Sequence, residues 1–139
     1  MNIFFIDLEV TKHTKQTMTV GYFYPPKNIK EVSSSLSKLK NQLEQTKPRY
    51  ICGHNFLSHD QRFLEETGVF PLLLHSKIID SLLVSMLIFP DKSSHKLTKP
   101  YKTDIHIENN PLEDCRATHA LLIHCIDHFK NLNVELQNG

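Results

Sequence analysis

The run Phe4-Phe5-Ile6-Asp7-Leu8-Glu9 is the most informative stretch of the chain. Its apolar residues predict a buried β-strand, at whose end two acids stand with one leucine between them. Side chains two residues apart in a strand point to the same face, so Asp7 and Glu9 converge. Two such carboxylates repel each other unless a cation lies between them, and a divalent metal bound by oxygen ligands is the economical candidate. The alternative is a strand that simply runs out into solvent at Asp7.

Length and composition predict a single globular domain over residues 1–139. The sequence is 40% hydrophobic and 22% charged, which is typical of a soluble protein. The formal net charge of +1 gives no whole-molecule attraction for polyanions, so a nucleic-acid surface would have to be a local patch. Three cysteines without CxxC spacing (Cys52, Cys115 and Cys125) favour reduced thiols in a cytoplasmic protein.

No membrane segment is predicted. The N-terminal residues lack the basic flank of a signal peptide. The apolar stretch 70–89 contains His75, Lys77 and Asp80, each of which is costly at the centre of a bilayer. A buried strand followed by a helix is therefore the better interpretation of that stretch.

The remaining pattern indicates a mixed α/β chain. Strands are predicted where β-branched and aromatic residues gather, over residues 2–10, 18–24, 29–32, 50–53 and 77–80. Helices are predicted from the capping serines 33–35 to Lys47-Pro48, over 58–67, from the fifth strand to about 89, and over 112–132. Residues 90–110 are polar and without period, which predicts a long loop of the kind that often carries function.

Three further acids accompany the first pair. Asp60 lies beyond the predicted strand that ends at Gly53, near the start of a helix, and Asp114 lies in the first turn of the last helix. A carboxylate in either position is stabilised by the positive N-terminus of the helix, which is an ordinary structural reason for an acid there. Asp80 lies at the edge of the apolar pair Ile78-Ile79.

The order of these groups along the chain resembles the DEDD 3′–5′ exonuclease superfamily, in its DnaQ-like, DEDDh-type form. The matching residues of its three motifs are Asp7 and Glu9, then His54, Asn55 and Asp60, and finally Asp114. The segment 78–82 is similar to the intermediate strand of that superfamily. Within it, the chain most resembles exonuclease-like domains associated with RecQ-type helicases, through segments 51–55, 59–60, 89–90, 95–97 and 109–114.

This resemblance implies an RNase H-like exonuclease fold, with a mixed five-stranded sheet flanked by helices and a second strand antiparallel to its neighbours. It also implies metal-dependent 3′–5′ hydrolysis of phosphodiester bonds, in which two Mg²⁺ or Mn²⁺ ions about 4 Å apart hold the scissile phosphate. Asp7 would bridge both ions, Glu9 and Asp114 would complete one shell, and Asp60 would serve the other. Zinc is less expected, because no His/Cys cluster has ligand spacing.

One position departs from the family pattern. The DEDDh branch places a general-base histidine five residues before its last aspartate, and here that residue is Asn109. A related branch uses a tyrosine four residues before, where this chain has Asn110. An amide can orient water but cannot accept its proton at neutral pH. His95 and His106 are the nearby candidates for the base, with His95 preferred for its family-like His-Lys-Leu context; either is otherwise an ordinary solvated histidine.

The expected partner is the 3′ end of single-stranded DNA or RNA, with a helicase or another nucleic-acid-processing protein as a further candidate. Lysines 92, 96, 99 and 102 with Tyr101 could bind phosphates and stack on a base, although ordinary solvated charge explains them equally well. The residues predicted to contact nucleic acid are His54, Asn55, Phe56, Lys96, Lys99, Tyr101 and Asn109. Because of Asn109, a catalytically degenerate binding or helicase-docking module remains the alternative function.

Overall fold

The computed structural model describes residues 2–11, 17–67, 76–97 and 110–138. Five strands form one sheet in the order β3-β2-β1-β4-β5. They are β1 (Ile3–Thr11), β2 (Thr17–Tyr24), β3 (Ile29–Ser33), β4 (Tyr50–Gly53) and β5 (Lys77–Asp80). β2 is antiparallel to β1 and β3, whereas β1, β4 and β5 run parallel. The predicted mixed five-stranded sheet with an antiparallel second strand is therefore confirmed.

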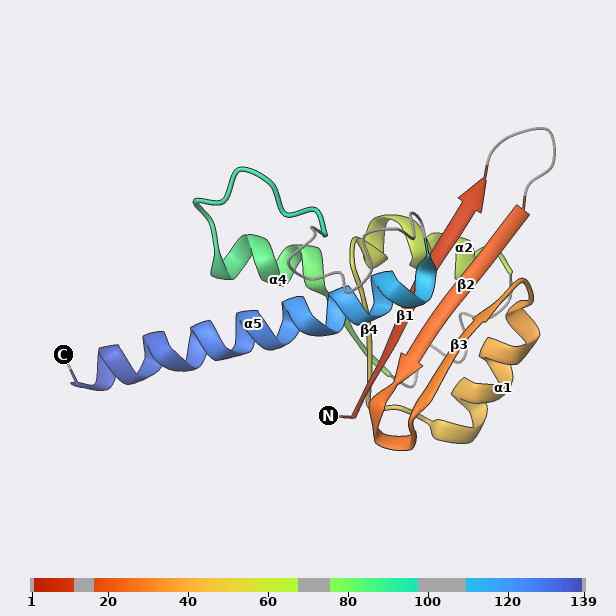
Figure 1. Cartoon of the computed structure of the whole chain (residues 1–139), viewed down its shortest axis with the longest axis horizontal. Coiled ribbons are helices and arrows are strands. Elements are labelled where there is room, and N and C mark those ends of the chain that lie inside the picture. Colours follow the sequence, from red (N-terminus) through yellow and green to blue (C-terminus); the bar gives the residue numbers. More distant parts are fainter. Residues whose placement is uncertain (1, 12–16, 68–75, 98–109, 139) are drawn as a thin grey trace.

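Helices cover both faces of this sheet (Figure 1). The short elements are a 3₁₀ turn η1 (Pro25–Lys27), a π-helical turn η2 (Phe56–Asp60) and helix α2 (Gln61–Glu66). The longer helices are α1 (Leu36–Thr46), α4 (Ser81–Ile88) and α5 (Pro111–Asn138). Ser35 caps α1 by accepting a hydrogen bond from the Ser37 N–H, as the capping-serine pattern predicted.

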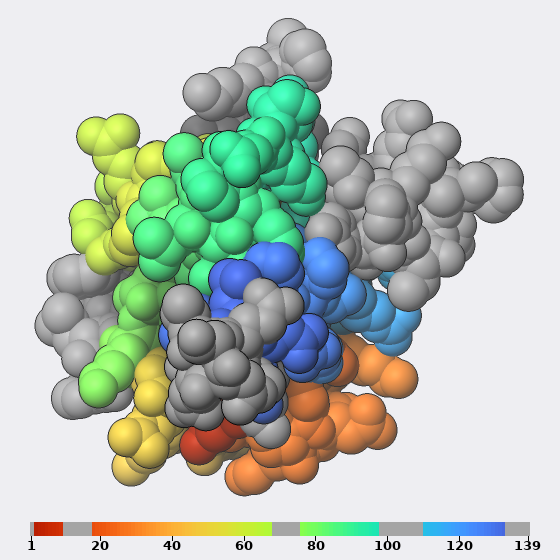
Figure 2. All heavy atoms as spheres, turned by 90° about the vertical axis from the view of Figure 1, so that its left-hand side faces the viewer, coloured from red at the N-terminus to blue at the C-terminus, as the bar shows by residue number. Residues whose placement is uncertain are grey.

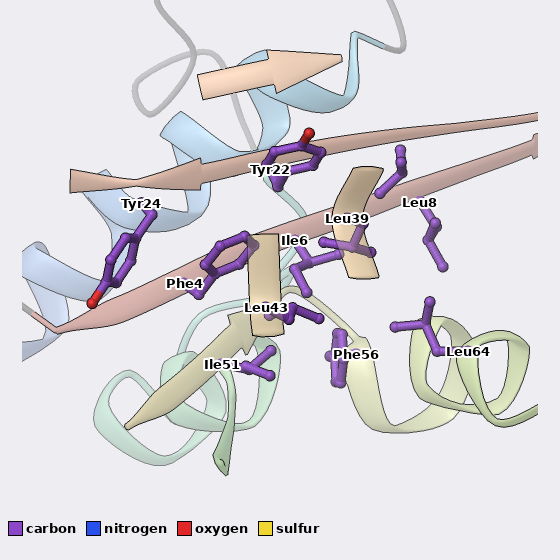
Figure 3. Packing of buried hydrophobic residues seen from close by; sticks show 11 residues of the cluster. Phe4, Ile6, Leu8, Tyr22, Tyr24, Leu39, Leu43, Ile51, Phe56 and Leu64 are labelled. Atoms are coloured by element: carbon purple, nitrogen blue, oxygen red, sulfur yellow. The ribbon is translucent and has the colours of Figure 1, made fainter. Parts of the chain in front are cut away.

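The larger core cluster lies between the sheet and the α1 and α2 side. Alternate residues of β1 (Phe4, Ile6 and Leu8) point to this side and pack with Leu39, Leu43, Ile51, Phe56 and Leu64 (Figure 3). Every second residue of β1 points the opposite way, and there Ile3 and Phe5 pack with Cys52, Cys115 and Leu122. Asp7 and Glu9 continue this second face, so the first acid pair lies on the side of the sheet that α5 covers.

Helix α5 begins and ends beyond the predicted bounds 112–132, because nothing after Leu132 breaks a helix before Gly139. Its apolar stripe has two parts. Thr118, Leu122 and Cys125 are buried, whereas Phe129 and Leu132 are 58% and 40% exposed. The last turns of α5 extend beyond the sheet (Figure 1). In the view turned by 90°, α4 and the residues after it lie against α5 (Figure 2), consistent with the contacts between these two helices.

The cysteines and the hydropathy of the helices agree with the sequence predictions. Cys52, Cys115 and Cys125 are buried and free, as small apolar residues would be. Among the described residues, no helix combines the length and the apolar character needed to cross a membrane.

Candidate metal centre

Three carboxylates meet where β1 passes under the start of α5. One carboxylate oxygen from each of Asp7, Glu9 and Asp114 lies within 4.8 Å of the other two. Asp7 and Glu9 come from one face of β1, and Asp114 comes from the first turn of α5. The structure thus brings together the first and third acidic groups of the sequence, which are more than one hundred residues apart.

Two features of the chain fix Asp114 over the strand. Asn110 caps α5: its Oδ1 accepts hydrogen bonds from the N–H groups of Leu112 (3.0 Å) and Glu113 (3.3 Å). Gly21, which pairs with Asp7 across the β1–β2 ladder, leaves room for the helix. A Cβ at Gly21 would lie only 2.3 Å from the carbonyl carbon of Pro111. The Cys115 thiol donates to the carbonyl oxygen of Gly21 at 3.2 Å, which ties the same turn to β2.

Asp60 approaches the cluster from the end of η2. It is buried, and its Oδ2 accepts a hydrogen bond from the Leu8 N–H at 3.3 Å, between the two acids of β1. Its Oδ1 lies 2.6 Å from Nδ1 of His59. Asp60 is not one of the three acids within 4.8 Å, but its charge acts on Asp7. The fourth acid therefore lies beside the three-acid cluster and not inside it.

The electrostatics of the site are unfavourable without a cation. Burial, followed by the charges of Asp60, Asp114 and Glu9, raises the pKa of Asp7 to about 10. Burial, followed by the charge of Asp114, also raises the pKa of Glu9. Burial raises the pKa of Asp60 to about 6, although His59 opposes that shift. Oδ2 of Asp7 is buried and has no hydrogen-bond partner among the described residues, which is a costly state for a carboxylate oxygen.

A divalent cation would resolve both features. It would supply the positive charge that the clustered carboxylates lack and a partner for the buried oxygen of Asp7. The donors are all carboxylate oxygens, the ligand type that suits Mg²⁺ and Mn²⁺ better than Zn²⁺. The residues present therefore fit a hard metal ion, and such an ion would allow the site to bind a phosphate group.

Asp80 supports the turn that carries the second motif, a role that sequence reasoning did not find. Its carboxylate accepts hydrogen bonds from the N–H groups of Asn55 (2.9 Å), Leu57 (3.1 Å) and Leu82 (3.0 Å). The first two hold the entry to η2, where Asn55 has a left-handed backbone with φ 58°. The third caps α4. The only sequence signal was the position of Asp80 at the end of an apolar strand, which is where parallel strands gather polar groups.

Two buried serines on one face of α4 each contact a histidine. Ser81 Oγ lies 2.9 Å from Nδ1 of His54, and Ser85 Oγ lies 2.8 Å from Nδ1 of His95. Both serines are buried, so each hydroxyl needs such a partner. Burial lowers the pKa of His54, and the charge of Asp114 is among the influences that oppose this shift. His95, the preferred candidate for the base, is held on the same helix face one turn farther along.

The predicted nucleic-acid contacts divide into three groups. Phe56 is fully buried in the larger core cluster, so its predicted contact with nucleic acid is wrong: the turn after β4 folds it inward against Gly53. The neighbouring Leu57 is 44% exposed. Asn55 and Lys96 are exposed. The predictions for Lys99, Tyr101, His106 and Asn109 lie outside the described residues.

Comparison with known proteins shows a likeness of fold. No protein-family model matches the sequence, and no curated protein matches it significantly. Among solved structures, the chain is similar to the family B DNA polymerase from the hyperthermophilic archaeon Pyrobaculum calidifontis, with a TM-score of 0.58 and 14% sequence identity. The match covers 89% of this chain and 24% of the polymerase chain, so the chain spans about a quarter of the length of that protein. The mixed α/β architecture is compatible with an RNase H-like fold.

Proposed function

We propose that this chain is a metal-dependent 3′–5′ exonuclease with an RNase H-like fold of the DEDD type, which hydrolyses phosphodiester bonds at the 3′ end of single-stranded DNA or RNA. The observation that carries the proposal is the buried, unpartnered Oδ2 of Asp7 among three further acids. A buried carboxylate with a purely structural role normally accepts a hydrogen bond from a nearby donor. A group of carboxylates held together at such a cost is typical of a site for divalent cations.

The chemistry assigned to each acid follows its position. Asp7, Glu9 and Asp114 would hold one Mg²⁺ or Mn²⁺ ion, and Asp7 with Asp60 would hold a second. The ions would supply charge neutralisation for the scissile phosphate and its leaving oxygen. The chain itself keeps the four carboxylates in place through the Gly21–Pro111 contact, the Asn110 cap and the hydrogen bond from Leu8 to Asp60. The likeness of fold to a DNA polymerase supports nucleic acid as the substrate class.

The test is stepwise degradation of 5′-labelled single-stranded DNA and RNA with Mg²⁺ or Mn²⁺. Wild-type protein is expected to shorten the oligonucleotide from its 3′ end, and EDTA is expected to stop the reaction. Asp7→Asn and Glu9→Gln are expected to lower kcat by at least about 10²-fold, because each removes charge that the transition state needs. Glu44→Gln is the matched control, since Glu44 is an exposed acid on α1.

A different result would favour the alternative module. If wild-type protein binds oligonucleotides but releases no mononucleotide with either metal, the exonuclease proposal is wrong. The degenerate binding or helicase-docking function would then be the better interpretation. Binding of a helicase without turnover would distinguish docking from simple nucleic-acid binding.

A further inference from the structure

Both oxygens of the Asp60 carboxylate are in contact with a donor. Oδ2 accepts a hydrogen bond from the Leu8 N–H at 3.3 Å, and Oδ1 lies 2.6 Å from Nδ1 of His59. An ionised carboxylate only accepts hydrogen bonds, so Nδ1 of His59 carries the proton and donates it. The Asp60 side chain is 3% exposed, whereas that of His59 is 55% exposed. The buried acid is thus held by the backbone of β1 and by an imidazole that is itself in contact with solvent.

The contact between His59 and Asp60 joins two residues that are adjacent in the chain. Adjacent side chains of an α-helix point about 100° apart and do not face each other. Here the pair lies at the end of η2, a π-helical turn, and such turns are rare and frequently found at functional sites. The entry to η2 is fixed by the hydrogen bonds that the N–H groups of Asn55 and Leu57 donate to Asp80. The backbone that carries the pair is therefore held in place.

The two donors together fix the orientation of the Asp60 carboxylate. The last torsion of an aspartate side chain has a broad energy profile, so a carboxylate held at Oδ2 alone can still turn its plane. The contact of His59 with Oδ1 removes this freedom. A carboxylate has about four acceptor positions, and these two donors use only two of them. His59 therefore restricts Asp60 without exhausting its capacity to bind a cation.

We propose that His59 is the positioning residue for the second metal ion: its hydrogen bond holds Asp60 in the orientation in which Asp60 and Asp7 share that ion. The inference rests on the proposed function, which assigns the second ion to these two acids. The first ion has ligands of its own, since oxygens of Asp7, Glu9 and Asp114 already lie within 4.8 Å of one another. The role of His59 is therefore confined to one of the two ions.

The first test counts metal ions and needs no turnover. Calorimetric titration of the wild-type protein with Mn²⁺ is expected to show two ions per chain. Electron paramagnetic resonance is expected to show magnetic coupling between them, because the ions of a two-metal site lie about 3.5–4 Å apart. His59→Ala is expected to keep the affinity for the first ion and to weaken the second by about 10–100-fold, as for loss of a hydrogen bond to a ligand. The coupled signal is expected to disappear at Mn²⁺ concentrations that saturate the wild type.

A second variant separates the hydrogen bond from the rest of the imidazole. The side-chain amide of an asparagine at position 59 can donate to Oδ1 of Asp60 as Nδ1 does. His59→Asn is therefore expected to bind the second ion with nearly wild-type affinity. His124→Ala is the matched control, because His124 is an exposed histidine that lies about 15 Å farther along α5 than Asp114. Circular dichroism verifies that each variant is folded.

Turnover supplies an independent measurement of the same effect. The Mn²⁺ concentration that gives half-maximal kcat is expected to rise about 10–100-fold in His59→Ala, while kcat at saturating Mn²⁺ is expected to remain close to that of the wild type. Asp60→Ala is expected to lose the second ion. Adding His59→Ala to Asp60→Ala is expected to have no further effect, because residues that act through one contact are not additive.

Several outcomes would overturn the inference while leaving the exonuclease intact. Wild-type affinity for both ions in His59→Ala would do so, as would an equal loss of both ions. A His59→Asn variant as weak as His59→Ala, or a further loss in the double variant, would show that His59 does not act through its hydrogen bond to Asp60. A single Mn²⁺ in an active wild-type protein would leave no second ion to position. If the wild-type protein shows no metal-dependent turnover and binds at most one Mn²⁺, the proposed function is wrong as well.

Discussion

The main chain of Pro111 occupies the space that a side chain on Gly21 would need. The carbonyl carbon of Pro111 and the nitrogen of Leu112 would lie 2.3 Å and 2.5 Å from a Cβ at that position. Gly21 is also the direct partner of Asp7 in the β1–β2 ladder. The start of α5 therefore sits against the strand pair at the level of the first acid, and this close approach is what brings Asp114 to Asp7.

Gly21→Ala is expected to separate the third acid from the first two. The obstructing atoms belong to the backbone and cannot rotate away, so the start of α5 must shift, at a cost of about 1–3 kcal/mol of unfolding free energy. Mn²⁺ affinity is expected to fall by about 10–100-fold, as for loss of a group that positions metal ligands. Isothermal titration calorimetry and urea unfolding measure these effects. Lys30→Ala, at an exposed position of β3, is the control, and equal metal affinity in both variants would contradict the prediction.

The metal-free protein is expected to lose stability as the pH rises through neutrality. The pKa of Asp7 is raised from 3.8 in the unfolded chain to about 10 in the folded one. The folded state thus holds a proton that the unfolded state has released, and the free energy of unfolding falls between about pH 4 and pH 10. Thermal unfolding in EDTA from pH 5 to pH 9 checks the sign. Addition of Mn²⁺ at 100 times its Kd is expected to restore about 2.7 kcal/mol.

Asp7→Asn is the matched variant for these unfolding experiments across the pH range. The amide needs no proton to occupy the folded site, whereas wild-type Asp7 must take one up on folding at pH 8, so the metal-free variant is expected to be more stable than wild type at that pH, on the order of 1–3 kcal/mol. Its dependence on pH is expected to flatten, and Mn²⁺ is expected to add little stability. A variant less stable than wild type at pH 8, or one that Mn²⁺ still stabilises fully, would show that Asp7 is an ordinary structural acid.

Asp80→Ala is expected to be strongly destabilising although Asp80 is no member of the acid cluster. Three backbone N–H groups from η2 and α4 lose their acceptor, and an unsatisfied buried donor costs about 1–3 kcal/mol. Urea unfolding is expected to show a loss of at least about 2 kcal/mol. Asp80→Asn keeps one acceptor oxygen and is expected to lose less. Equal stability of the two variants would mean that solvent replaces the carboxylate.

The apolar stripe of α5 provides a comparison within one helix. Leu122→Ala is expected to cost about 2–5 kcal/mol, because Leu122 is buried against the sheet. Phe129→Ala removes a larger side chain from the same stripe but is expected to change stability by less than about 0.5 kcal/mol, because this residue is mostly exposed. Chemical denaturation of both variants at low protein concentration measures the difference. A large loss for Phe129→Ala would mean that the last turns of α5 are covered in solution.

The sequence by itself determined the elements that depend on local pattern. The alternation in β1, the serine cap of α1 and the helical spacing of α5 gave strands and helices close to those observed, since short-range periodicity and capping decide such elements. The same alternation placed Asp7 and Glu9 on one face. The order of the motifs resembles that of the DEDD exonucleases, and only this resemblance implied that Asp60 and Asp114 belong with them.

Only the tertiary structure decided how these groups meet. The inward turn of Phe56, the hydrogen bonds of Asp80 to η2 and the position of His54 depend on contacts between residues that are distant in the sequence. The space at Gly21 likewise cannot be predicted from the local sequence. A glycine in a strand indicates that another part of the chain approaches closely, but it does not show which part. Long-range packing places the third acid at 4.8 Å or less from the first pair, and no periodicity of the chain encodes that distance.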